Sequence, residues 1–129
     1  MVEILEVKDA EKRRAILRQG GIAEDEATVL KMADHDAVLG SCCLHIRKDK
    51  AVLLALAAGE YDFGGKPDAE QSFILDSLVR SAASYAETKG ALFIETAFPD
   101  FYDFFRRMGF ETDSNHAFGS IAVIVKYHA

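Results

Sequence analysis

The sequence lacks any long hydrophobic run. Its longest uninterrupted apolar stretch, residues 51–59, is far shorter than the roughly 20 residues of a membrane-spanning helix. At the N-terminus, Glu3 and Glu6 interrupt the only apolar stretch, which is not the pattern of a secretory signal peptide. We therefore expect neither a membrane-spanning segment nor export.

Basic residues are also in short supply. The chain has 15 Lys and Arg against 21 Asp and Glu, a formal net charge of −6, and it has no run of basic side chains. Proteins that bind nucleic acids or anionic membranes use basic patches for that purpose. The charge balance therefore predicts that neither is a partner.

Cysteine is limited to two adjacent residues, Cys42 and Cys43. Neighbouring side chains on a strand point to opposite faces, so the pair suits neither a disulfide framework nor a zinc site. No two of the four histidines have the i, i+4 spacing of a helical metal site, and we expect no metal. A nucleophilic Cys43 would need His45 beside it, whereas small residues filling a sheet are the favoured interpretation. This cysteine usage predicts the reducing cytoplasm.

The chain does have enough apolar material for one core. Half of its 129 residues are hydrophobic and 28% are charged. This length and balance are typical of one folded domain rather than of a disordered segment. We expect a single domain over residues 1–129.

The first half of the chain predicts a strand, a helix and three further strands. Asp9 is placed as the N-cap of a helix over residues 10–19, which Gly20 ends. Short polar turns separate the later strands, as in an antiparallel meander, and the last strand is apolar on both faces, so we expect it to be covered on both sides. The expected strands cover residues 2–7, 27–33, 37–47 and 51–58.

The second half begins with the strongest helical pattern. Asp68 and Gln71 form a candidate capping box, and Gly90 is placed at the C-terminal cap. Between them, apolar pairs recur about four residues apart, which is typical of a one-faced helix. The remaining expected elements are a strand over residues 91–97, a helix over 100–108, a short strand over 110–112 and a strand over 121–127.

Together these elements predict an α+β fold in the order β-α-βββ-α-β-α-ββ, with helices on both faces of a mixed sheet. This order, with the stretch Phe105 to Phe110 (FRRMGF), resembles the GCN5-related N-acetyltransferase (GNAT) family. The resemblance runs from Val2 to Tyr127 and includes residues 84–91, which are similar to the end of the family's long helix. It implies an enzyme that transfers an acetyl group from acetyl-CoA to an amine of a small molecule or a peptide.

In the family, the fourth strand and the helix after it bind acetyl-CoA. The resemblance implies that the pantetheine arm lies along the backbone near Leu56 and Ala57 and that Lys66 holds the phosphates. Gly64 and Gly65, just upstream, could supply backbone N–H donors for the same phosphates.

Residues 66–71 depart from the family's pyrophosphate-binding pattern. Where the family has glycines, this sequence has Ala69 and Gln71, and Asp68 and Glu70 bring carboxylates toward the place of a diphosphate. Two like charges at contact distance near a surface cost on the order of 1 kcal/mol or more. The segment is therefore either a rearranged phosphate site or an ordinary capped helix.

Proton transfer would also rely on unusual residues. The family often uses the tyrosine of its tyrosine-x-x-x-Gly-Phe motif as the general acid, and Phe105, which the resemblance places among the cofactor-binding residues, occupies that position. Tyr102, one turn earlier, is the candidate acid; its other interpretation is a half-exposed tyrosine beside an aromatic stripe. Glu95 on the fifth strand is the candidate base; its other interpretation is a solvated glutamate at a strand end.

Two functions therefore stay open. One is an acetyl-CoA-dependent N-acetyltransferase. The other is a GNAT-like domain that binds a ligand or a partner protein without acyl transfer, because fold-level analogy alone does not decide activity. In either case the last strands could pair across a homodimer.

Overall fold

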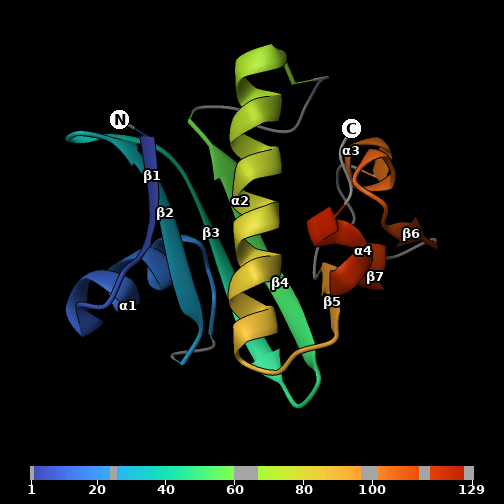
Figure 1. Ribbon diagram of the computed structural model, residues 1–129. Helices are drawn as coiled ribbons and strands as arrows, with labels where there is room; N and C mark the ends of the chain where they lie inside the picture. Colours follow the sequence, from blue (N-terminus) through green and yellow to red (C-terminus); the bar gives the residue numbers. More distant parts are fainter. Residues whose placement is uncertain (1, 24–25, 60–66, 97–101, 114–116, 127–129) are drawn as a thin grey trace.

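The computed structural model describes residues 2–23, 26–59, 67–96, 102–113 and 117–126 (Figure 1). The strands are β1 (Val2–Glu6), β2 (Thr28–Asp34), β3 (Ala37–Arg47), β4 (Lys50–Ala58), β5 (Phe93–Thr96), β6 (Glu111–Thr112) and β7 (Ala117–Ser120), and the helices are α1 (Ala10–Gln19), α2 (Ala69–Thr88), α3 (Tyr102–Arg107) and α4 (Ile121–Lys126). The strands form one sheet in the order β1-β2-β3-β4-β5-β7-β6, parallel at β4–β5 and antiparallel at the other pairings. The predicted α+β class with a mixed sheet is confirmed.

Helix α1 covers one face of the sheet. The Asp9 carboxylate accepts the backbone N–H groups of Glu11 and Lys12 at 3.0 and 3.1 Å, as its N-cap position predicts. Leu17 is buried in a small apolar cluster between the helix and the strands, and Arg13 donates to the carbonyl oxygen of Ala27 at 3.0 Å. These contacts hold α1 against the start of β2.

Helix α2 covers the opposite face and lies close to β3 and β4 (Figure 1). Its capping box between Asp68 and Gln71 is formed, and its apolar stripe is buried. The helix approaches the sheet closely at Gly40, where an added Cβ would lie 2.5 Å from the carbonyl oxygen of Ala57 and 2.8 Å from Cγ2 of Ile74. Only glycine permits this approach, which sets the N-terminal half of α2 over the end of β4.

Strand β4 is buried on its α2 side, as its apolar pattern predicts, but its other face is only partly covered beyond Val52. A bulge interrupts its pairing with β3: Leu44 is opposite Leu53 and Cys43 is opposite Ala55, so Leu54 is the extra residue. Leu54 and Ala55 both pack on the α1 side, whereas Leu53 belongs to the core under α2.

The C-terminal segment corrects one sequence prediction. The expected strand over residues 121–127 is wrong, because residues 121–126 form helix α4 and the preceding Ala117–Ser120 forms the last strand. Ile121 and Ile124, one helical turn apart, are fully buried, and Arg80 of α2 donates to the carbonyl oxygen of Ile124 at 3.2 Å. Packing against α2 therefore overrides the strand preference of β-branched residues.

Candidate functional site

The parallel strands β4 and β5 pair over only four residues. The ladder runs from Lys50 opposite Phe93 to Leu53 opposite Thr96, and the bulge residue Leu54 comes next on β4. Beyond it, residues 55–58 of β4 pair with β3 on one side, and within the described ranges no strand pairs with their other side. Bulges re-aim strands and end pairing, often beside functional sites. The edge of β4 after Leu54 is therefore the first part of the candidate site.

The predicted cofactor-binding residues Leu56 and Ala57 lie on this edge. Leu56 is buried in the core under α2, and Ala57 is exposed on the other face of the sheet. Their backbone groups are placed where an extended ligand could lie beside the strand. Gly64, Gly65 and Lys66 lie outside the described residues, and their roles stay predictions.

The N-terminus of α2 lies close to the end of β4. The Asp68 carboxylate accepts the backbone N–H of Gln71 at 2.8 Å, and Oε1 of Gln71 accepts the backbone N–H of Asp68 at 3.0 Å. A pocket of about 240 Å³ lies here, lined by Gly59 at the end of β4 and by Asp68 and Glu70, among others. The helix end is thus closed by its own side chains and bordered by carboxylates.

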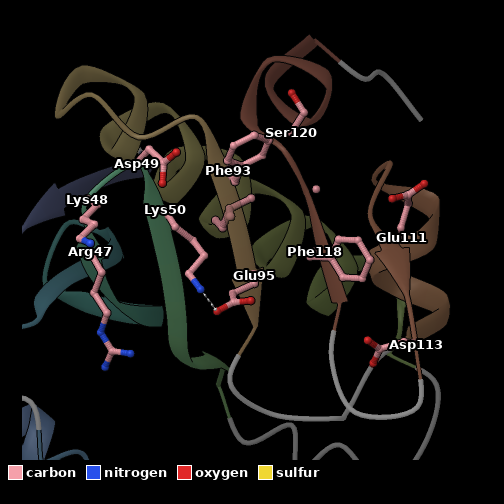
Figure 2. A pocket seen from close by; sticks show the side chains of 12 residues that line it. Arg47, Lys48, Asp49, Lys50, Phe93, Glu95, Glu111, Asp113, Phe118 and Ser120 are labelled. Atoms are coloured by element: carbon pink, nitrogen blue, oxygen red, sulfur yellow. Dashed lines mark ion pairs between the residues drawn. The ribbon is translucent and has the colours of Figure 1, made fainter.

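A larger pocket, of about 900 Å³, lies on the face of β5 and β7 away from α2 (Figure 2). Ile94 is fully buried in the core under α2, so its neighbours Phe93 and Glu95 face this pocket. Phe93 is 49% exposed, and Phe118 of β7 lies opposite Glu95 in the strand register. The pocket therefore combines an aromatic floor with charged side chains, which is typical of a small-molecule site.

Glu95 forms an ion pair with Lys50 across the two parallel strands. Nζ of Lys50 lies 2.9 Å from Oε1 of Glu95, and Figure 2 shows the two side chains pointing toward one another. The Glu95 side chain is only 24% exposed, and its residue directly precedes Thr96, where the β4–β5 ladder ends. The structure thus places Glu95 in this pocket, one residue before the end of the described β4–β5 ladder; its role as a base stays a prediction.

Several features of this pocket were not predicted from the sequence. The partner Lys50 and the aromatic Phe93 come from segments whose own patterns carry no binding signal. Glu111 and Asp113 reach the same pocket from the β6 region. The only signal in the sequence is the alternation around Ile94, which leaves Phe93 and Glu95 on the face opposite the main core.

The FRRMGF stretch forms the end of helix α3. The backbone N–H of Gly109 donates to the carbonyl oxygen of Arg106 at 3.1 Å, and that of Phe110 donates to Phe105 at 3.0 Å. With Gly109 at φ +102°, this is a Schellman C-cap, whose hydrophobic contact is the pair of Phe105 and Phe110 rings, 4.9 Å apart.

Phe105 is fully buried, with an edge-on contact to Phe104 at 5.5 Å between ring centroids. This packing gives Phe105 a structural role in the core, and its predicted contact with a cofactor stays a prediction. Helix α3 begins at Tyr102, the candidate acid, whose side chain lies outside the described residues.

The two cysteines are buried in the centre of the sheet. Burial raises the pKa of the Cys43 thiol to about 11 and that of Cys42 further still. Both thiols are therefore protonated at neutral pH, which supports their interpretation as packing residues. Among the residues that the structure describes, no three His, Cys, Asp or Glu side chains gather as metal ligands, and no helix is long and apolar enough to cross a membrane.

Comparison with known proteins identifies the fold. No protein-family model matches the sequence, and no curated protein matches it significantly. Among solved structures, the putative acyl-CoA N-acyltransferase from Klebsiella pneumoniae aligns with a TM-score of 0.67 at 11% identity, covering 94% of this chain and 98% of that one. The chain has the GNAT fold.

Two further GNAT structures show the same likeness. The GNAT family N-acetyltransferase YhbS from Escherichia coli, in complex with CoA, aligns with a TM-score of 0.60 at 15% identity over 94% of this chain and 81% of that one. The aminoglycoside 6'-N-acetyltransferase from Enterococcus faecium aligns with a TM-score of 0.63 at 9% identity over 94% and 97%. The resemblance stated from the element order is thus confirmed for the GNAT fold.

Proposed function

We propose that this protein is an N-acyltransferase that transfers an acetyl group from acetyl-CoA to an amine of a small molecule or a peptide. The observation that carries the proposal is the edge of β4 after the bulge at Leu54, where residues 55–58 pair with β3 on one side and with no described strand on the other. The GNAT fold raises the prior for this reaction, although fold alone does not establish activity.

The free edge of β4 fits one part of the donor. A pantetheine arm is an extended chain with two amide groups, which can pair with the backbone near Leu56 and Ala57 as an added strand does. The N-terminus of α2 does not fit a diphosphate in the same way, because Asp68 and Gln71 cap it and Glu70 adds a second carboxylate. The phosphate contacts predicted for Lys66, Gly64 and Gly65 lie outside the described residues.

The acceptor amine would enter through the pocket that Phe93 and Phe118 floor. In the reaction, the amine nitrogen bonds to the acyl carbon, the carbon–sulfur bond breaks, and sulfur leaves with the bonding electrons. The nitrogen gives up one proton and the sulfur takes one. Glu95, which lines this pocket, is the proposed acceptor of the proton from the amine, and Tyr102 is the proposed donor of the proton to sulfur.

The N-terminus of α2, which does not fit the diphosphate of acetyl-CoA, favours a second function. The capping box and the two carboxylates at the start of α2 suit a domain that binds a ligand or a partner without acyl transfer. The burial of Phe105, which replaces a tyrosine in the motif of the family, agrees with this alternative.

Calorimetric titration with acetyl-CoA, with CoA as the control, separates the two functions. Micromolar binding of both, followed by thiol release in the presence of a panel of amines, would support the acyltransferase. Absence of binding at millimolar ligand would contradict it and favour the partner-binding domain. Binding without thiol release from any amine would favour a ligand-binding domain.

A further inference from the structure

The capping box at the start of α2 takes up one of the N–H donors that a phosphate would use. The four first N–H groups of a helix are the usual donors to a bound anion, because no carbonyl oxygen of the helix reaches them. Here the N–H of Gln71 already donates to the Asp68 carboxylate at 2.8 Å, and the Gln71 side chain accepts the N–H of Asp68 at 3.0 Å. The Asp68 carboxylate is thus an anion of this chain that already lies at the N-terminus of the helix.

The charge at this end opposes a second anion. Asp68 and Glu70 both line the pocket between α2 and the end of β4, and that pocket has a volume of about 240 Å³. A diphosphate placed there would lie close to two carboxylates. The positive end of the helix dipole already interacts with the negative charge of Asp68. By contrast, the β4 edge near Leu56 and Ala57 requires no charge from its ligand.

We infer that the acyl donor is recognised through its pantetheine arm, and that acyl-pantetheine thioesters without the adenosine diphosphate serve as well as acetyl-CoA. The inference rests on the proposed acyl transfer and narrows its donor class. The bond changes are the same for either donor: the amine nitrogen gains the acyl carbon and loses a proton, and the thiol of pantetheine or of CoA leaves with one.

The direct test compares acetyl-CoA with acetyl-pantetheine as donors to one amine, with thiol release as the readout. We expect kcat/KM for acetyl-pantetheine to be at least as high as that for acetyl-CoA, whereas a working diphosphate site with two charge-assisted hydrogen bonds would favour acetyl-CoA by about a hundred-fold or more. A hundred-fold preference for acetyl-CoA would overturn the inference while leaving the proposed acyl transfer intact.

Variants at the start of α2 test the cause. In the double variant Asp68→Ser with Glu70→Gln, serine still caps the helix, and both charges are removed. We expect the KM for acetyl-CoA to fall about five-fold or more, because each charge at contact distance is worth about that factor, and the KM for acetyl-pantetheine to stay unchanged. An unchanged KM for acetyl-CoA would overturn the argument from charge.

The matched control removes a carboxylate from the other end of the same helix. Glu87 is exposed near the C-terminus of α2, far from the Asp68 capping box. The Glu87→Gln variant should keep the wild-type ratio of the two donors. A rise in acetyl-CoA use by this variant too would assign the effect to net charge and overturn the role of the helix end.

Binding measurements separate failure of the inference from failure of the proposed function. Titration with CoA and with pantetheine, which needs no turnover, should give a dissociation constant for pantetheine that is no higher than that for CoA. Binding of CoA alone would overturn the inference and leave the proposed function standing. Binding of neither compound would overturn both.

Discussion

The backbone N–H of Phe110 donates a hydrogen bond to the carbonyl oxygen of Phe105 at 3.0 Å, and the two rings pack with their centroids 4.9 Å apart. This pair locks the end of helix α3, with Gly109 between them in a left-handed conformation. The glycine and phenylalanine that give the sequence its resemblance to a catalytic motif thus have a local structural purpose, which is to end a helix and bury an aromatic pair.

Replacing Gly109 with alanine should therefore destabilise the fold. A Cβ at φ +102° is strained, and we expect a loss of about 1 kcal/mol or more in the free energy of unfolding. Thermal denaturation would show this as a fall in Tm of about 4 °C or more. The fall in Tm is compared with that of Gly21→Ala, which changes another glycine of positive φ, at the end of α1. An unchanged Tm in Gly109→Ala would contradict the capping role.

The proposed role of Glu95 predicts a kinetic effect. Glu95→Gln keeps the size of the side chain but removes the carboxylate that pairs with Lys50, and a lost general base lowers kcat/KM by about 10²-fold. Thiol release measures the effect, and circular dichroism checks that the variant is folded. The Glu87→Gln variant, which removes a carboxylate outside the pocket, should retain activity. Full activity in Glu95→Gln would assign the residue a structural role only.

The close approach of α2 and β4 at Gly40 predicts a loss of stability on substitution. In Gly40→Ala, the new Cβ would lie 2.5 Å from the carbonyl oxygen of Ala57 and 2.8 Å from Ile74, so α2 or β4 must shift. Overpacking of this kind costs about 1–3 kcal/mol. Urea denaturation should show the loss, and wild-type stability in this variant would contradict the close approach. The same shift should weaken binding of pantetheine, because Ala57 belongs to the β4 edge.

The buried thiols predict a loss of stability at high pH. The pKa of Cys43 rises from its ordinary value of 9.0 to about 11 on folding, so the folded state favours the protonated thiol. The resulting stabilisation is complete below pH 9 and is lost as pH rises from about 9 to 11, by on the order of 1 kcal/mol. Tm measured across this window should fall less steeply for Cys43→Ala than for the wild type. Equal slopes would contradict the prediction.

Much of the fold follows from local signals in the sequence. Asp9 and Asp68 cap their helices because each has a short side chain with an acceptor oxygen, which can accept the first N–H groups that have no partner within the helix. The meander follows from polar turns of a few residues between apolar strands. The helix α4 could not be predicted in this way, because Ile121 and Ile124 are helical only through their burial against α2.

The candidate site was only partly predictable for the same reason. Leu56, Ala57 and Glu95 were placed near one site by the resemblance; in the structure Glu95 is opposite Val52 in the β4–β5 ladder, and the pocket that it lines extends toward Lys50 rather than toward Leu56. The bulge at Leu54 leaves no mark in a strand that is apolar throughout. The partner Lys50 depends on strand register, which is a tertiary property. The predicted homodimer and the cytoplasmic location stay predictions.

The short ladder between β4 and β5 has a mechanical consequence. Within the described residues, four residue pairs join the meander β1–β4 to the strands β5, β7 and β6, with α2 and its contacts as the common support. A ligand that lies along residues 54–58 would add hydrogen bonds to this edge of β4 and so extend the sheet beyond the four paired residues. Binding of such a ligand would then make the connection between the two halves of the sheet stiffer. The protein would be most deformable in its ligand-free state.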